Sequence, residues 1–321
     1  MKAPALPAPN ATWPSFPAQE AELDPAVVED TLDWVGGRNS TGFVIGHTEG
    51  IVAERYWRCE TGFEASPMLG PTFLDDGRSR EDVASAQKSV VSVLIGIGIG
   101  KGLFGVDDPV TTHVGPGWSR AERRQEESIT LRHLLTMTSG LDHAARFRAA
   151  LGSEWDYNLG STWHTLKRVL VRVTGIGLES VLRDWLAEPL GMAESEFVAR
   201  PIDESLPEEA RGATQYPDGE PVEGFVTSAR DLLRFGLAVG AGGVTANADL
   251  AIAPGYLAES LRPSTPLNPS YGLLWWLNGQ AFSLAPRGGR AEGPLLPSAP
   301  GDTVAALGAL GRALYICLLY T

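Results

Sequence analysis

The sequence predicts an α+β fold: an antiparallel sheet built from strands at both ends of the chain, flanked by helices, with a mainly helical lobe inserted in between. Two strand-like runs, 42–47 and 51–57, stand near the start, and two more, 271–277 and 304–319, stand near the end. The patterns between them are helical. Because strands and helices are segregated rather than alternating, the order favours an antiparallel fold over a parallel α/β fold.

An extended arm precedes the folded domain in this prediction. Residues 1–24 hold five prolines, which block helix formation and disfavour sheet pairing, and Trp13 and Phe16 are the side chains expected to pin the arm. The rest of the chain is long enough for one large core. We expect a single domain over 25–321, with an α/β lobe over 25–82 and 225–321 and a helical lobe over 83–224.

Local signals define the first elements. Asp24 followed by Pro25 is typical of a helix N-terminus and Gly36-Gly37 of a helix stop, so a helix is predicted over about 25–35. Glu49-Gly50, between the first two strand-like runs, predicts a hairpin. The polar stretch 61–82 is predicted to be irregular.

Helices in the middle of the chain are predicted from apolar spacing and from capping residues. Thr227-Ser228 with Asp231 behind them is a capping pattern for a helix that runs to about Val239. Residues 200–224, rich in Pro, Glu and Gly, are predicted to be a connector. The other predicted helices cover 83–105, 131–137, 163–174 and 178–190.

Charge and composition argue against several classes of binding partner and cofactor. A net charge of −13 and a pI near 4.9 argue against binding to nucleic acids or anionic membranes, which need a basic surface. Cys59 and Cys317 give no disulfide framework and are expected to be free thiols. The five histidines are scattered without metal-ligand spacing, so we expect no metal and no other cofactor, and a small molecule as the partner.

The sequence predicts no targeting signal. Its first 20 residues lack the unbroken apolar stretch of a secretory signal, and no run reaches the roughly 18 apolar residues needed to cross a bilayer. We therefore expect a cytoplasmic protein without a membrane segment.

The longest apolar run, 83–105, also carries a candidate nucleophile. Ser85 and Lys88 are three residues apart, which places both side chains on one face of a helix, with Ser85 in the first turn. Because the helix is apolar, Lys88 is expected to point into the protein, where desolvation lowers the pKa of its amine. Such an amine can take the hydroxyl proton of Ser85 and activate its oxygen for attack.

Several motifs, in this order along the chain, resemble the serine β-lactamase and penicillin-binding-protein superfamily, in the class C-like branch that also holds esterases and 6-aminohexanoate-dimer hydrolases. The resemblance covers about residues 40–316. It is carried by Ser85-Ala86-Gln87-Lys88, Gly102-Leu103, Asp107-Asp108-Pro109-Val110, Arg132–Leu141 (RHLLTMTSGL), Trp155-Asp156-Tyr157-Asn158, Pro189-Leu190-Gly191-Met192 and Tyr271–Trp276 (YGLLWW).

The resemblance implies a β-lactamase/DD-peptidase-like fold and a serine hydrolase of small esters or amides. Ser85 would be the acylated nucleophile, Lys88 its general base, and Tyr157 a phenol that shares the proton network and protonates the leaving group. The oxyanion hole would use the backbone N–H of Ser85 and that of Ala309, next to Gly308.

Two departures from the family's pattern bear on the substrate. Leu159 stands where the family usually has a polar Asn or Ser, so a donor toward substrate is missing or is supplied by Asn158. Ala306-Leu307-Gly308 replaces the frequent Lys-Thr-Gly and removes the cation that would recognise the carboxylate of a penicillin. These departures argue against a dedicated β-lactamase or transpeptidase, and they leave open a catalytically silent relative used for binding or regulation.

A third departure concerns the end of the chain. The family's pattern continues with another strand and a long helix, whereas this sequence stops at Cys317–Thr321, so we expect a truncated C-terminus. Translated sequencing-adapter DNA, TGT CTC TTA TAC ACA, would encode the same five residues.

Other conspicuous residues are expected to be structural. His133 lies on a helix between leucines, and Ser139-Gly140 is a helix stop without the Gly-x-Ser-x-Gly pattern of a nucleophile. The string Gly100–Gly105 follows a helix rather than a strand, which excludes a dinucleotide site. Four tryptophans, Trp155, Trp163, Trp275 and Trp276, either line an apolar acyl pocket or belong to the core.

Overall fold

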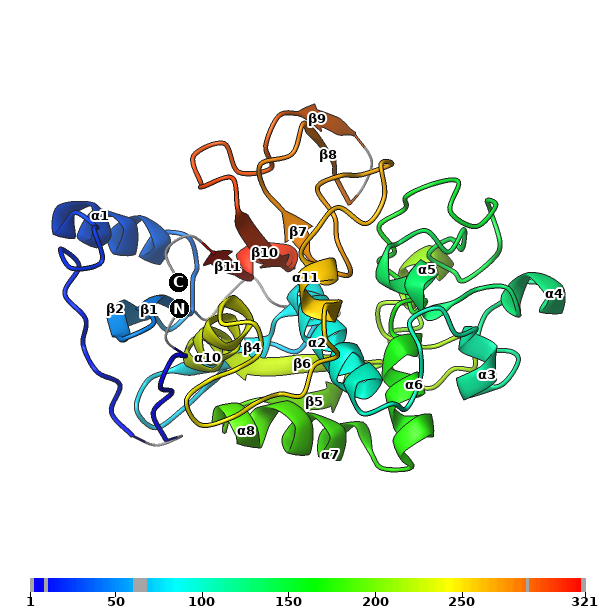
Figure 1. Ribbon diagram of the computed structural model, residues 1–321, viewed down its shortest axis with the longest axis horizontal. Helices are drawn as coiled ribbons and strands as arrows, with labels where there is room; N and C mark the ends of the chain where they lie inside the picture. Colours follow the sequence, from blue (N-terminus) through cyan, green and yellow to red (C-terminus); the bar gives the residue numbers. More distant parts are fainter. Residues whose placement is uncertain (1–2, 9–10, 60–67, 287–288, 319–321) are drawn as a thin grey trace.

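A computed structural model describes residues 3–8, 11–59, 68–286 and 289–318 (Figure 1). The helices are α1 (Pro25–Gly36), α2 (Gln87–Gly100), α3 (Val110–Val114), α4 (Arg123–Glu126), α5 (Leu131–Leu135), α6 (Thr165–Thr174), α7 (Leu178–Leu182), α8 (Glu188–Leu190), α9 (Glu208–Arg211), α10 (Ala229–Gly240) and α11 (Tyr256–Ser260). The strands are β1 (Gly42–His47), β2 (Gly50–Tyr56), β3 (Thr72–Phe73), β4 (Ser79–Asp82), β5 (Glu196–Ala199), β6 (Glu223–Ser228), β7 (Trp276–Leu277), β8 (Phe282–Leu284), β9 (Arg290–Glu292), β10 (Thr303–Leu307) and β11 (Ala313–Cys317).

The fold is α+β, as predicted, but its strands form separate antiparallel sheets. The described strands are ordered β3-β4-β6-β5 and β11-β10-β7, with β1-β2 and β8-β9 as two-stranded hairpins. The prediction of one sheet shared by the two ends of the chain is therefore wrong. Instead α10 lies against both β1 and β11, so one helix covers the N-terminal hairpin and the C-terminal strands (Figure 1). Period-2 patterns identify strands but do not say which strands pair.

Elements with a strong local signal form where the sequence predicts them. Asp24 caps α1 by accepting a 2.9 Å hydrogen bond from the N–H of Ala26. The β1–β2 hairpin forms around Glu49-Gly50. Ser228 caps α10 and accepts a hydrogen bond from the N–H of Asp231.

Four segments differ from the prediction. Within 61–82, of which 61–67 lie outside the described residues, β3 and β4 form, and β4 was missed because all four of its residues, Ser-Arg-Glu-Asp, are polar. The run 271–277 is a strand only over β7, because Leu274 has a left-handed φ of 63°. The run 304–319 is two strands, β10 and β11, and the connector 200–224 holds the short helix α9.

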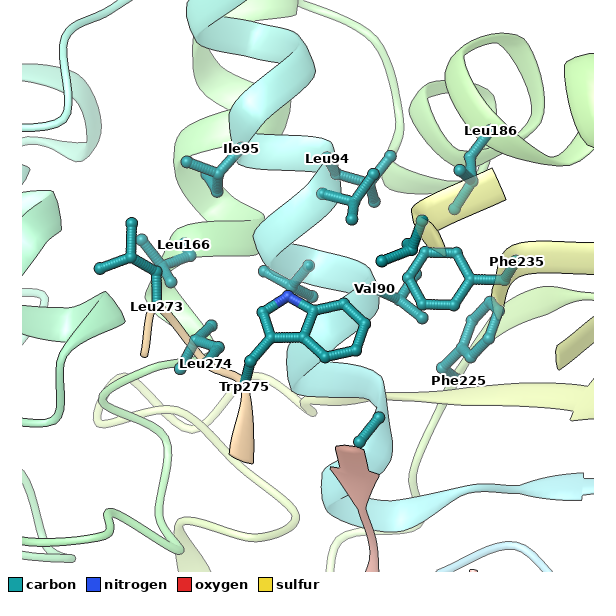
Figure 2. Close-up of a cluster of buried hydrophobic side chains, with 14 of the residues drawn as sticks. Val90, Leu94, Ile95, Leu166, Leu186, Phe225, Phe235, Leu273, Leu274 and Trp275 are labelled. Carbon is teal, nitrogen blue, oxygen red and sulfur yellow. The ribbon is translucent and has the colours of Figure 1, made fainter. Parts of the chain in front are cut away.

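The core is organised around α2, whose side chains are buried over almost the whole helix. Figure 2 shows Val90, Leu94 and Ile95 on α2 surrounded by side chains from other elements. These neighbours are Leu166 of α6, Leu186 of the π-helical turn Arg183–Ala187, Phe225 of β6, Phe235 of α10, and Leu273, Leu274 and Trp275 before β7. Trp275 stacks on Phe235 with ring centroids 6.0 Å apart and is fully buried, so this tryptophan belongs to the core.

The arm packs along the domain, as expected from its two aromatic residues. Phe16 stacks on His47 with centroids 4.2 Å apart, and its N–H donates to the carbonyl of Ile51. Trp13 is buried, with the Arg234 guanidinium 4.9 Å from its ring.

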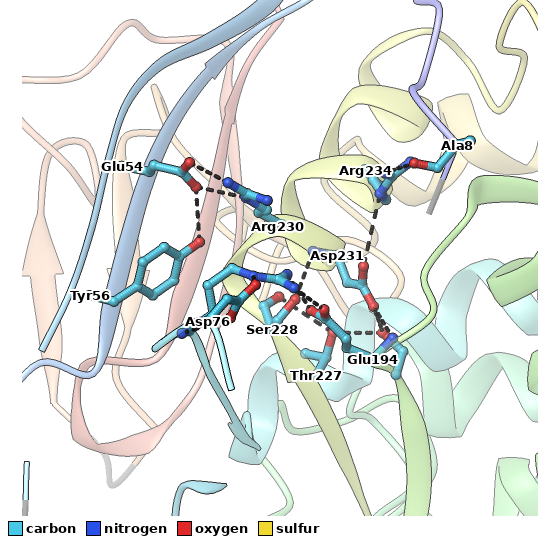
Figure 3. A network of polar contacts seen from close by, with 12 residues as sticks. Ala8, Glu54, Tyr56, Asp76, Glu194, Thr227, Ser228, Arg230, Asp231 and Arg234 are labelled. Carbon is cyan, nitrogen blue, oxygen red and sulfur yellow. Dashed lines mark hydrogen bonds and ion pairs between the residues drawn. The ribbon is translucent and has the colours of Figure 1, made fainter. Parts of the chain in front are cut away.

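A polar network then joins the arm, the first hairpin and α10. In Figure 3, Arg234 donates to the carbonyl of Ala8, while Arg230 forms two hydrogen bonds with Glu54 of β2. Among the described residues, no helix is both long and apolar enough to span a membrane.

Candidate active site

Ser85 lies in a single 3₁₀ turn, Ala84–Ala86, which leads directly into α2. Ala84 has a φ of 52°, in the left-handed region that alanine rarely adopts. Two hydrogen bonds hold it there: its N–H donates to Asp82 Oδ1 at 2.9 Å, and its carbonyl accepts from Gln87 Nε2 at 3.0 Å. Strain of this kind is typical of functional sites, where the surroundings fix a conformation that presents one side chain.

Lys88 meets Ser85 as the sequence spacing predicts. Its Nζ lies 3.0 Å from Ser85 Oγ, and the side chain is only 2% exposed. The amine also lies over the rings of Tyr157 and Trp163, 4.5 and 4.4 Å from their centroids. Burial, together with the positive charges of Arg200 and Lys167, lowers the pKa of Lys88 well below its usual value. An amine without a proton can accept one from the adjacent hydroxyl.

Tyr157 lies beside the same serine, on the loop between α5 and α6. Its hydroxyl is close enough to the Ser85 and Trp276 side chains for both to act on its pKa. Burial raises the pKa of Tyr157 to about 12, so the phenol keeps its proton at neutral pH. Its ring packs against three others, Trp276, Tyr271 and Trp155, at centroid distances of 5.4, 5.8 and 6.0 Å, which fix the position of the hydroxyl.

The end of β10 comes close to the Ala84–Ala86 turn because Gly308 has no side chain. A Cβ at Gly308 would lie 2.3 Å from the carbonyl oxygen of Val83, well inside contact distance. The N–H of Gly308 itself donates to the carbonyl of Arg312. Gly308 and Ala309 therefore line the same cavity as Ser85.

Asn158 is not brought to this cavity. Its amide nitrogen donates to the carbonyls of Leu141 and Asp142, at 3.4 and 3.0 Å, and the residue is buried. The next residue, Leu159, lines the cavity instead. The side chain of Asn158 therefore holds the neighbouring loop and does not line the cavity, where a substrate contact was predicted for it.

A cavity of about 470 Å³ opens over Ser85. None of the described residues that line it is charged: Ser85, Tyr157, Leu159, Trp276, Ser283, Leu284, Ala285, Pro286, Ala291, Pro294, Leu295, Leu307, Gly308 and Ala309. Trp276 is thus the tryptophan of the predicted four that belongs to a pocket wall.

Half of the lining residues come from the β8–β9 hairpin and the segment after it, which sequence reasoning missed. Two buried asparagines anchor this wall. Asn268 Oδ1 accepts from the N–H of Leu284, and Asn278 exchanges hydrogen bonds with the backbone of Leu296. The sequence signal was weak because the apolar residues of 281–296 are separated by Pro, Gly and charged residues.

A buried ion pair next to the Ala84–Ala86 turn was also missed by the sequence analysis. Arg200 makes two hydrogen bonds to Asp82, at 2.7 and 2.8 Å, and both side chains are almost completely buried. The pair orients the Asp82 carboxylate that holds the N–H of Ala84. Removing either partner would leave an uncompensated buried charge next to the turn that carries Ser85.

His133, which was expected to be structural, makes a structural contact. His133 completes a capping box with Thr130 at the start of α5, its Nδ1 accepting from the N–H of Thr130.

In the described part of the chain, no group of three or more His, Cys, Asp or Glu side chains is placed to hold a metal ion.

An antiparallel α+β fold in which a buried lysine lies beside a serine that opens onto a cavity fits a serine hydrolase. The chain belongs to the beta-lactamase family, whose model matches residues 29–315. This match confirms the resemblance seen in the sequence, to class C-like serine hydrolases that include esterases.

Two curated relatives match parts of the chain. Esterase EstB of Burkholderia gladioli is 28% identical over 180 residues, covering 44% of this chain and 44% of the esterase. An uncharacterized protein of Alkalihalophilus pseudofirmus is 25% identical over 219 residues, covering 65% of this chain and 60% of that protein. The chain thus spans about half the length of these relatives.

Solved structures share the fold over most of the chain. A penicillin-binding protein homolog from Caulobacter crescentus has a TM-score of 0.60 at 15% identity, covering 97% of this chain and 91% of its own. EstCE1, a hydrolase with promiscuous acyltransferase activity, has a TM-score of 0.58 at 17% identity, covering 93% and 89%. At these identities the likeness concerns the fold alone.

Proposed function

We propose that this protein hydrolyses small, uncharged esters or amides through an acyl-enzyme on Ser85. The observation that carries the proposal is the 3.0 Å contact between Ser85 Oγ and the buried amine of Lys88, with Tyr157 lining the same cavity as that serine. In a catalytically silent relative, no constraint would keep a base within reach of that hydroxyl. Both groups stand within reach here, which favours catalysis.

Acylation begins when Ser85 Oγ attacks the substrate carbonyl carbon while its proton passes to Lys88 Nζ. The carbonyl oxygen becomes an oxyanion, which the backbone N–H groups of Ser85 and Ala309 stabilise from the cavity wall. When the intermediate collapses, the bond to the leaving group breaks. Tyr157 gives that group its proton and regains one from the Lys88 ammonium.

Deacylation repeats these proton transfers with water. A water molecule attacks the acyl carbon, and its proton passes to the Lys88 and Tyr157 pair. The ester bond to Ser85 Oγ breaks, the serine regains its proton, and the carboxylic acid leaves. Both half-reactions use the same amine, so Lys88 must be neutral at the start of each.

The cavity wall supports the restriction to uncharged substrates. Leu307 occupies the middle position of the segment where the family often has Lys-Thr-Gly, and the cavity's described lining carries no charge. An anionic group placed there would lose its hydration without gaining a partner. We expect p-nitrophenyl hexanoate to be hydrolysed with at least about tenfold higher kcat/KM than the matched p-nitrophenyl ester of adipic acid, whose free carboxylate is the main difference. Equal values for the two esters would contradict an uncharged acyl pocket.

Covalent labelling tests the acyl-enzyme itself. A fluorophosphonate should add its mass to the peptide that contains Ser85, and p-nitrophenyl esters should release an initial burst of p-nitrophenol, because acyl-enzyme accumulates when deacylation is slower. A folded full-length protein that takes up no label and shows no hydrolysis would instead support a binding or regulatory role.

A further inference from the structure

A second buried lysine, Lys167, lies close to Lys88. Lys167 on α6 is 1% exposed, and its Nζ forms a 3.2 Å ion pair with Glu223 Oε2 of β6 and donates to the Glu223 carbonyl. Lys167 Nζ also lies 3.5 Å from Gln87 Oε1, and Gln87 Nε2 donates to the carbonyl of Ala84 in the turn that carries Ser85. The mechanism above gives Lys167 no step.

The two amines are close enough for the charge of Lys167 to affect the pKa of Lys88. Both lie over the ring of Trp163, with Lys88 Nζ 4.4 Å and Lys167 Nζ 5.6 Å from its centroid. Only one of them has a carboxylate in the contacts described above: Glu223 pairs with Lys167, whereas Lys88 contacts a hydroxyl and two aromatic faces. This asymmetry favours a proton on Lys167 and none on Lys88.

Resting on the function proposed above, we propose that Lys167 is a positioning residue whose charge keeps Lys88 in its proton-accepting form. Burial lowers the pKa of Lys167 only to about 8, because Glu223 opposes the effect, so the amine is charged at neutral pH. Its charge then disfavours a second proton on Lys88 within the same water-poor cluster.

Other charged or titratable groups stand beside this cluster, and one of them, Arg200, acts on Lys88 in the same direction as Lys167. His164 is buried, and burial with the neighbouring cations lowers its pKa well below its usual value, so it is neutral. Arg200 is bound to Asp82 and stays in place in every Lys167 variant, so a shift in those variants reports the loss of the Lys167 charge. The charged or titratable groups around the Lys88–Lys167 pair are Asp82 from β4, Tyr157 from the loop before α6, His164 just before α6, Arg200 after β5 and Glu223 from β6.

The test is the acid limb of the pH profile of kcat/KM for a neutral p-nitrophenyl ester, which reports the free-enzyme pKa of the general base. In Lys167→Gln, which keeps an N–H donor for the Glu223 carbonyl, the limb should move to higher pH by about one unit. At any one pH on the acid side of the profile, kcat/KM of this variant should therefore be about tenfold lower than that of the wild type. Lys167→Met should shift the limb in the same direction.

Two controls separate the charge from the packing. Lys167→Arg keeps the cation and should leave the limb in place, as should Lys101→Gln, which removes an exposed charge at the end of α2. An unmoved limb in Lys167→Gln, or an equal shift in Lys167→Arg, would overturn the proposal. If neither Lys167→Gln nor Lys167→Met folds, Lys167→Arg alone provides the test. This variant keeps the positive charge, so a displaced acid limb in it would contradict the proposal. An inactive wild type at every pH would refute the proposed function instead.

Discussion

Replacing Ser85 with alanine is expected to lower kcat for p-nitrophenyl esters by about 10⁴ to 10⁶, the loss typical of removing a nucleophile. The remaining lysine and tyrosine cannot form an acyl-enzyme, so the burst of p-nitrophenol and the fluorophosphonate label should both disappear. Because Ser85 Oγ lines an open cavity, its removal leaves no buried void, and thermal unfolding should be close to that of the wild type. Steady-state kinetics and intact-protein mass spectrometry measure these effects.

Ser92→Ala is the matched control on the same helix. Ser92 is fully buried, and its hydroxyl contacts the Tyr256 hydroxyl at 3.4 Å, away from the cavity. Its loss should cost on the order of 1 kcal/mol of stability and leave kcat within about twofold. Hydrolysis by Ser85→Ala within tenfold of the wild type, or a label on another residue, would show that the nucleophile lies elsewhere.

The parts of the site that sequence could predict are those set by local geometry. Ser85 and Lys88 meet because a three-residue spacing puts two side chains on one face of a helical turn, whatever the rest of the fold does. The caps of α1 and α10 were predicted for the same reason, since Asp24 and Ser228 bind backbone groups within three residues.

What sequence could not predict depends on contacts between distant segments. Asp82 and Arg200 are 118 residues apart in the chain, and nothing in the polar segment around Asp82 indicates that it is buried. Asn158 and Leu159 are neighbours, and only the folded loop decides that the leucine, not the asparagine, lines the cavity. The apolar wall from the β8–β9 hairpin likewise appears only when the hairpin folds back over Ser85.

The resemblance to a known family assigned Tyr157, which spacing alone would not connect to a serine 72 positions earlier in the chain. The structure brings its side chain to Ser85 through the aromatic packing of Trp276 and Tyr271. Lys167 had neither a motif nor a local partner. A lysine in an amphipathic helix is ordinarily solvated, so only the structure indicates that it is buried beside Trp163.

Replacing Lys88 with methionine should lower kcat by about 10³, within the range typical of losing a general base, because Ser85 would then have no acceptor for its proton. The acid limb of the kcat/KM profile should vanish with the amine that produces it. Lys101→Met, at the exposed end of α2, is the control and should keep both the rate and the limb. A Lys88→Met variant with more than a tenth of wild-type kcat, or with its limb intact, would assign the base to another group.

The same substitution has an expected effect on stability. Burial holds the pKa of Lys88 in the folded chain below its unfolded value of about 10.4, so between those two values the unfolded chain binds more protons and wild-type stability rises with pH. Methionine has no proton to bind, and its apolar chain suits the space between Tyr157 and Trp163. Lys88→Met should therefore gain stability over the wild type near neutral pH, and the gain should shrink as pH approaches 10. Urea unfolding across that range measures it, and a gain that grew with pH would mean that the folded protein holds the Lys88 amine in its charged form.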